Sequence, residues 1–278
     1  MQNLKSKKIA ILDGYNLIYR SRYASKWQKP GEHTIVYNFY RSLRKLVEDL
    51  NPEKVYFVLE GRPKQRLEAA PDYKGNRVYE KDESYSRQKK EILDLLINHF
   101  PITVVKHPDY ECDDIISHLA CQNHKDDEVT VVSSDTDFYQ MFSIHDNIKV
   151  YNPIKKKYLE SPDYDYVTFK SLKGDSCDNI EGFKGIGEKR ASALAKDKES
   201  LTEFLNKENR LEKFNHNFFM VKFHEIQNLN RITFSGSSLN SECILNCFTN
   251  YGFNSIIKEK PWNNFINTFG DLLWNKVI

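Results

Sequence analysis

Short apolar runs rich in β-branched residues alternate with stretches of helical periodicity, and this alternation constrains the fold more than any other feature of the sequence. The four apolar runs are residues 8–12, 54–59, 102–105 and 129–132. The helical stretches between them are 35–50, 85–99 and 113–122. Runs of this length that end at turn or charged residues are typical of buried strands in an α/β sheet. The pattern predicts a mostly parallel central sheet flanked by helices, with right-handed crossovers.

The strand pattern fades after about Pro162, where shorter helices are predicted at 167–172, 189–195, 201–205 and 217–227. We therefore expect an α/β domain at 1–162 and a helical lobe at 163–278. The segment 62–85 is basic and aromatic with few aliphatic residues, which predicts a loop or a marginal helix that stands off the core. The part from Arg231 onward indicates little about function.

Composition excludes several classes of protein. With 40% hydrophobic and 29% charged residues, the 278-residue chain is typical of a globular protein. No apolar run approaches the roughly 20 residues of a membrane span, and the start of the chain fits a first strand better than a signal peptide, so we expect a cytoplasmic protein. The five cysteines form no CxxC pair, which argues against a zinc site or a disulfide framework. The net charge of +2 does not by itself indicate a nucleic-acid-binding protein.

Acidic residues follow the predicted strands at their carboxyl ends. Asp13 follows the first, Glu60 the second, and Asp135 with Asp137 the fourth, while Glu111, Asp113 and Asp114 open the helix after the third. The carboxyl ends of parallel strands lie at one edge of a sheet, where ligands bind. Any one of these acids has roughly even odds of being a helix cap or a turn residue. Together they would repel one another unless cations lay among them.

The ligand chemistry indicates hard ions. Carboxylates without supporting histidine or cysteine pairs favour Mg²⁺ or Mn²⁺ over zinc. Two such ions about 4 Å apart hold a phosphodiester and its attacking water. The acids alone therefore predict metal-dependent hydrolysis of a phosphodiester.

The motifs resemble, in order, those of the 5′-nuclease (flap endonuclease) family, which includes phage 5′-3′ exonucleases and the N-terminal nuclease domain of bacterial DNA polymerase I. They are LDGYN at Asp13, YKGNR at Tyr73, YECDD at Glu111, SSDTDF at Asp135 and GDSCDNIEGFKGIGEKRA at Gly174. The resemblance covers about residues 8–195. It implies a PIN-like sheet and a helical lobe with a helix-three-turn-helix module, in which GFKGIG brings backbone amides to a duplex phosphate. A nucleotide-binding P-loop is excluded because GxxxxGK[ST] does not occur.

Carried over position by position, the resemblance implies nine metal ligands. They are Asp13, Glu60, Glu111, Asp113, Asp114, Asp135, Asp137, Asp175 and Asp178. Glu60 departs from the family, which has Asp there, and its extra methylene would shift an ion or hold it through water. The resemblance implies two Mg²⁺ or Mn²⁺ ions, and K⁺ at the helix-three-turn-helix module.

The basic residues are expected to contact DNA. Tyr73, Lys74 and Arg77 resemble family residues near the scissile phosphate, with Lys74 stabilising the developing negative charge, and Arg20 is expected to contact the same phosphate. Residues 62–99 are expected to form a mobile arch, or clamp, over the metals. Without the motif, a basic run is more often only an exposed face. The residues expected to bind DNA are Lys64, Arg66, Arg87, Lys89, Lys90, Gly182, Lys184, Gly185, Gly187, Lys189 and Arg190.

The resulting hypothesis is a structure-specific 5′-3′ exonuclease and flap endonuclease that hydrolyses DNA with a 5′ flap, a nick or a free 5′ end. We expect a free-standing monomer, in the cytoplasm of a bacterium or a phage-infected cell, with replication proteins as partners. Two alternatives stay open. A PIN-like ribonuclease is one, because acids do not distinguish DNA from RNA, although GFKGIGEKR favours duplex DNA. A catalytically inactive protein that binds branched DNA is the other, although it would be expected to lack several acids.

Overall fold

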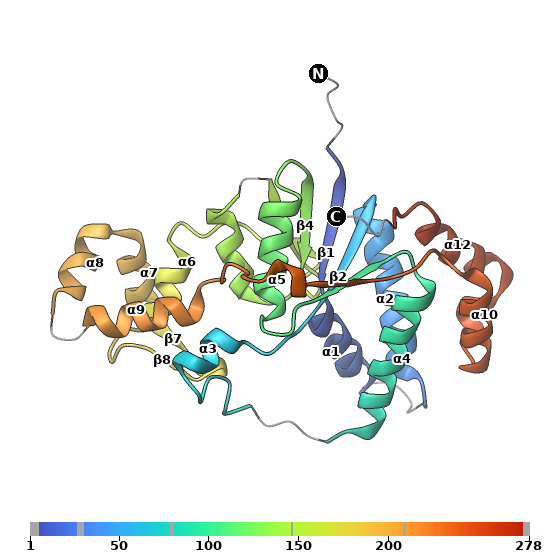
Figure 1. Cartoon of the computed structure of the whole chain (residues 1–278), viewed down its shortest axis with the longest axis horizontal. Helices are drawn as coiled ribbons and strands as arrows, with labels where there is room; N and C mark the ends of the chain where they lie inside the picture. The colour runs from blue at the N-terminus through green and yellow to red at the C-terminus, as the bar shows by residue number, and fades with distance from the viewer. Residues whose placement is uncertain (1–5, 27–30, 78–80, 146, 208–209, 275–278) are drawn as a thin grey trace.

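The computed structural model describes residues 6–26, 31–77, 81–145, 147–207 and 210–274, and a seven-stranded sheet lies at its centre (Figure 1). The strand order is β6-β5-β4-β1-β2-β3-β9. The five inner strands are parallel: β1 (Lys8–Asp13), β2 (Lys54–Leu59), β3 (Thr103–Lys106), β4 (Glu128–Val132) and β5 (Ile148–Asn152). The edge strands are antiparallel: β6 (Lys157–Tyr158) and β9 (Thr233–Ser235). The predicted parallel sheet, with its four predicted strands, is confirmed.

Helices cover both faces of the sheet. On one face lie α1 (Gly14–Ser25), α2 (Thr34–Leu50), α4 (Glu83–His99), α10 (Ser241–Asn250), α11 (Asn254–Ile257) and α12 (Glu259–Gly270). On the other face lie α5 (Cys112–His118), the π-helix η1 (Leu119–Asn123) and the 3₁₀ helix η2 (Thr136–Ser143). Strand β1 shows the two-residue period of such a sheet, because Ala10 and Leu12 belong to the first core and Ile9 and Ile11 to the second.

A group of helices stands at one end of the molecule (Figure 1). It consists of α6 (Tyr166–Lys173), α7 (Glu188–Lys196), α8 (Lys198–Leu205) and α9 (Arg210–Val221), with the small strands β7 (Gly174–Asp175) and β8 (Ile180–Glu181) and the 3₁₀ turn η3 (Ser176–Asp178) between α6 and α7. Phe169, Leu172, Phe204 and Phe214 form its separate core. Helices α10 and α12 lie at the opposite end of the molecule. The division of the chain at residue 162 stays a prediction.

One helix of the C-terminal half ends earlier than predicted. The helix predicted at 217–227 ends at Val221. Beyond that residue the backbone N–H groups of Phe223 and His224 donate to the side chains of Gln140, at 3.1 Å, and Asp114, at 2.8 Å, so they no longer support a helix. The part after a short 3₁₀ turn, η4 (Leu229–Arg231), contributes an edge strand and three core helices, for which no prediction was made.

The basic segment that was expected to stand off the core is anchored to it. The short helix α3 (Lys64–Ala69) contains Arg66, which is 4% exposed, and Tyr73 in the following turn is 6% exposed. Helix α4 buries one face in the core from Gln88 onward. Residues 78–80 of the expected arch lie outside the described residues. The part of 62–99 that stands away from the core is therefore shorter than expected. Among the described residues, no helix combines the length and apolar character that a membrane span requires.

Candidate active site

The carboxyl end of β1 fixes the first acid of the site. Asp13 is the last residue of β1 and also caps α1, because its carboxylate accepts the N–H of Asn16 at 3.2 Å and the hydroxyl of Ser133 at 2.7 Å. A Cβ at the next residue, Gly14, would lie 2.5 Å from the carbonyl oxygen of Val58, so glycine lets α1 begin this close to β2. The position of Asp13 is thus set by backbone packing.

Asp13, Cys112 and Asp113 form the first acid group, whose potential ligand atoms all lie within 4.8 Å of one another. The Cys112 thiol lies 3.3 Å from Asp113 Oδ1 and 3.5 Å from Asp13 Oδ1. Burial and the charge of Asp135 raise the pKa of Asp13 to about 6, and the same two causes raise that of Asp113 well above its ordinary value. Within the described residues, neither acid has a lysine or arginine ion pair. No side-chain cation of the described residues therefore pairs with these two carboxylates.

Glu60 lies beside the first acid group at the carboxyl end of β2. Its carboxylate accepts the backbone N–H of Cys112 at 2.9 Å, which places it at the start of α5. Burial and the charge of Glu111 raise the pKa of Glu60 to about 7. Glu60 thus adds to the negative charge at this edge of the sheet.

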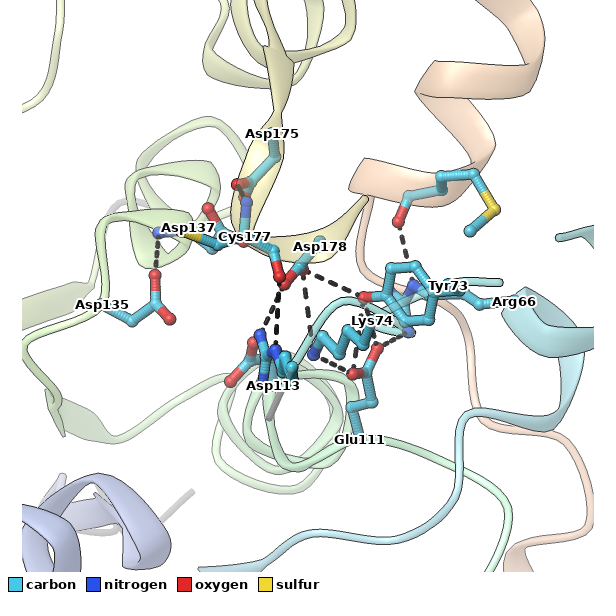
Figure 2. A network of polar contacts seen from close by, with 12 residues as sticks. Arg66, Tyr73, Lys74, Glu111, Asp113, Asp135, Asp137, Asp175, Cys177 and Asp178 are labelled. Carbon is cyan, nitrogen blue, oxygen red and sulfur yellow. Dashed lines mark hydrogen bonds and ion pairs between the residues drawn. The ribbon is translucent and has the colours of Figure 1, made fainter. Parts of the chain in front are cut away.

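Asp137, Asp175 and Asp178 form the second acid group, and their oxygens also lie within 4.8 Å of one another. They come from η2, β7 and η3, so the sheet and the helical end of the molecule both contribute (Figure 2). Lys170 on α6 pairs with Asp137 and, at 2.7 Å, with Asp175. Burial raises the pKa of Asp137 to about 6 although Lys170 opposes the shift. Burial also acts to raise the pKa of Asp175. The hydrogen bond from Lys170 outweighs it and holds this pKa below its ordinary value.

Residues of the arch segment bridge Glu111 and the second acid group (Figure 2). The Tyr73 hydroxyl lies 3.1 Å from Glu111 Oε2 and 3.2 Å from Asp178 Oδ2. Lys74 pairs with Glu111 and lies 3.8 Å from Asp178, and Arg77 pairs with Asp178 at 2.5 Å. The structure therefore brings Tyr73, Lys74 and Arg77 to the acids. Asp135 is exposed beside Asp137, whose N–H it accepts at 2.9 Å.

Asp114 and Arg66 form a buried ion pair. The Asp114 carboxylate is 1% exposed and accepts four hydrogen bonds, from the two Nη atoms of Arg66 and from the N–H groups of Glu111 and His224. No lone pair is left for an ion. Arg66 also contacts Glu111 at 2.7 Å and is buried, so it is not placed to reach DNA. In this structure the pair joins α3 to α5, and the metal-ligand role of Asp114 and the DNA-binding role of Arg66 stay predictions.

The remaining acids suit a hard divalent ion. Burial and neighbouring carboxylates raise the pKa values of Asp113 and Asp137, and bound cations would relieve the repulsion among these acids. The oxygen-rich donor set is that of Mg²⁺ or Mn²⁺ sites, with the Cys112 sulfur as the exception. The protein's own residues therefore fit divalent ions.

A family model for the N-terminal, resolvase-like domain of 5′-3′ exonucleases matches residues 8–171. The chain belongs to this 5′-3′ exonuclease family. It is 34% identical over 222 residues to a thermostable DNA polymerase I of Thermus thermophilus, a match that covers 74% of this chain and 26% of the polymerase. It is 30% identical over 215 residues to a 5′-3′ exonuclease of Mycoplasmopsis pulmonis, covering 73% of this chain and 70% of the relative. This chain thus spans about a quarter of the polymerase.

A solved structure of the T5 D15 protein, co-crystallised with metal ions, has the same fold. It superimposes with a TM-score of 0.58 at 19% identity and covers 94% of this chain and 97% of that one. The family resemblance drawn from the motifs is confirmed by the family model and by the exonuclease relative.

The other cations predicted for this exonuclease-family chain are distributed around the site. Arg20, on α1, is half-buried and has no hydrogen bond or ion pair within the described residues. Arg87 on α4 pairs with Glu91 at 2.8 Å, and Lys89 lies 5.0 Å from the centre of the Tyr15 ring. Lys64 and Lys90 are exposed.

The glycine-rich loop lies between β8 and α7. Gly185 has a φ of 77°, a left-handed conformation that favours glycine, and Gly182 packs against the carbonyl of Lys173. Gly187 caps α7 with open space around it. Lys184, Lys189 and Arg190 are exposed, and none has an ion pair in the part of the chain that is described. The loop therefore presents free cations beside a helix N-terminus.

Lys170 is the main residue of the site that sequence reasoning missed. In TFKSLK it looks like an ordinary exposed helix cation, because nothing local shows that α6 directs it at Asp137 and Asp175. Its only signal is its place five residues before Asp175. Cys112 is buried and lies against the first acid group.

Proposed function

We propose that this chain is a structure-specific 5′-3′ exonuclease and flap endonuclease that hydrolyses DNA near 5′ ends, nicks and junctions of single and double strand. The observation that carries the proposal is the pair of acid groups at one edge of the sheet, with Tyr73, Lys74 and Arg77 held against them. The family membership supports the reaction class.

The cofactors proposed are two Mg²⁺ or Mn²⁺ ions. Asp13 and Asp113 would hold one, and Asp137, Asp175 and Asp178 the other, with Glu60, Glu111 and Asp135 contributing directly or through water. Such ions, when bound, lower the pKa of an attacking water and stabilise a leaving oxygen.

The protein's own part in the reaction is to place and stabilise the scissile phosphate. Lys74 supplies positive charge where negative charge develops on the phosphate. Tyr73 orients Lys74 by holding its two acidic partners, Glu111 and Asp178, in place. Arg77 adds a second cation at the same edge. Arg20, half-buried and without a polar partner among the described residues, is available to the same phosphate from α1.

Two sets of residues are proposed to bind DNA. The loop from Gly182 to Gly187 with α7 would act as the helix-three-turn-helix module, binding a duplex phosphate and K⁺, with Lys184, Lys189 and Arg190 as its cations. Lys64, Arg87, Lys89 and Lys90 would line the path of a single strand. The enzyme would act as a monomer in a bacterial or phage-infected cytoplasm, together with replication proteins.

Cleavage of end-labelled 5′-flap, nicked and blunt duplexes tests the proposal, with Mg²⁺, Mn²⁺ or chelator in parallel reactions. We expect cutting at or near the 5′ junction with either ion and none in chelator. The double variant Asp135→Asn and Asp137→Asn should abolish cutting while keeping DNA affinity, and the matched control Asp49→Asn, far from the site, should cut normally.

Two other results would assign a different function. Preferential cutting of a matched RNA flap would make the chain a PIN-like ribonuclease. Tight binding of the DNA flap without cutting in any metal would make it an inactive branched-DNA-binding protein.

A further inference from the structure

The two acid groups differ in how the protein compensates their charge. Within the described residues, no lysine or arginine pairs with Asp13 or Asp113, whereas Lys170 pairs with Asp137 and Asp175 of the second group. The two groups should therefore respond differently to a divalent ion.

The packing around Lys170 holds its side chain against the second acid group. Its side chain is 12% exposed and extends from the middle of α6, which packs on α7 and α9. Burial alone would lower the pKa of Lys170, but the charges of Asp137 and Asp175 raise it above the ordinary value. A buried ammonium in charge-assisted hydrogen bonds is held more firmly than a surface lysine, so it is not an incidental contact.

An ammonium and a divalent ion compete for these carboxylates. The ligand atoms of Asp137, Asp175 and Asp178 lie within 4.8 Å of one another, and Lys170 Nζ pairs with Asp137 and lies 2.7 Å from Asp175 Oδ2. An ion bound to this group lies beside the ammonium, whose positive charge repels it. That repulsion has no counterpart at Asp13 and Asp113.

We propose that Lys170 is a resident counter-ion of the second acid group, which stabilises the metal-free protein and weakens the binding of a divalent ion there. The inference rests on the proposed metal sites but not on the substrate, because it concerns the protein without DNA.

Isothermal titration of chelator-treated, DNA-free protein with Mn²⁺ alone measures the effect. The binding event that Asp175→Asn weakens belongs to the second group. We expect Lys170→Met to tighten that event about tenfold, equivalent to roughly 1.4 kcal/mol, and to leave the other event nearly unchanged. Lys170→Gln, which stays polar, should act in the same direction if the methionine variant folds poorly. Lys173→Met, on the same helix but with a 43% exposed side chain, is the matched control and should change neither event.

Thermal unfolding separates a counter-ion from a lysine that is merely structural. Without metal, Lys170→Met should melt below wild type, because buried carboxylates lose their partner, and saturating Mn²⁺ should close the gap. The proposal would be overturned if the difference in melting temperature stayed the same in saturating Mn²⁺. It would also be overturned if Lys170→Met left Mn²⁺ binding at the second group unchanged or weakened it. Failure to cut any DNA would instead count against the proposed substrate and leave these results intact.

Discussion

Arg66 holds Asp114 through both of its Nη atoms, at 2.8 and 3.0 Å, deep beneath the acid groups. The same guanidinium contacts Glu111 and donates to the carbonyl oxygens of Met220, at 3.0 Å, and Lys222, at 2.8 Å. One side chain therefore joins α3, the start of α5 and the segment after α9. These three segments supply or flank the acidic edge, so Arg66 ties the base of the arch to the site.

Arg66→Met should destabilise the metal-free protein by about 3–5 kcal/mol, because it leaves a buried carboxylate without its partner. Urea denaturation followed by circular dichroism measures the loss. Lys64→Met, on the same short helix but exposed, should change stability by no more than about 0.5 kcal/mol. Adding Asp114→Leu to Arg66→Met should recover part of the loss. A single variant as stable as wild type would mean that the pair is dispensable.

The acids at strand ends could be placed from sequence because the carboxyl ends of parallel strands meet at one edge of a sheet. That rule places Asp13, Glu60 and Asp137 at the same edge of the sheet without knowledge of any contact. It could not show which way each carboxylate points. Asp113 and Asp114 are adjacent in sequence, yet Asp113 faces the first acid group and Asp114 faces Arg66. A helix turns about 100° per residue, so their roles depend on where α5 is rotated, which tertiary packing decides.

Long-range polar contacts account for the other differences between the sequence-based predictions and the structure. The helix predicted to reach residue 227 ends at Val221 because the side chains of Gln140 and Asp114 accept the next backbone N–H groups. Those partners are more than 80 residues away in sequence, so helical periodicity could not reveal them. Lys170 escaped prediction for the same reason.

Asp13 should make the stability of the metal-free protein depend on pH. Burial raises its pKa from 3.8 to about 6 in the folded chain, so the folded state holds this proton more tightly than the unfolded state. Its favourable contribution is therefore present below about pH 4 and is lost as the pH rises toward 6. Asp13→Asn should become increasingly more stable than wild type across that window, in urea titrations with chelator. Asp126→Asn, an exposed acid, is the control, and parallel curves for Asp13→Asn and wild type would contradict the assignment.

Lys74→Ala should lower the single-turnover cleavage rate of a 5′ flap by about 10²–10³, the usual loss when one electrostatic stabiliser of a transition state is removed. The fold should survive, because Arg66 still pairs with Glu111 and Arg77 with Asp178. DNA affinity, measured by fluorescence anisotropy in chelator, should change by less than about threefold, since catalysis depends on interactions stronger in the transition state than in the ground state. Lys125→Ala, exposed and remote from the site, should leave both quantities unchanged. A large loss of affinity with an unaltered rate would make Lys74 a DNA-binding residue only.

The free cations of the glycine-rich loop should determine the salt dependence of duplex binding. Each phosphate contact contributes about 0.9 to the slope of log affinity against log salt concentration, so Lys184→Ala with Arg190→Ala should reduce that slope by about 1.8. The cleavage rate at saturating DNA should stay within about twofold of wild type, because neither side chain contacts the acid groups. Lys198→Ala, equally exposed on the neighbouring helix α8, controls for a general loss of charge. If it lowers the slope as much per residue as the loop variants do, DNA binding is a diffuse effect of net charge, and the loop has no special role in gripping the duplex.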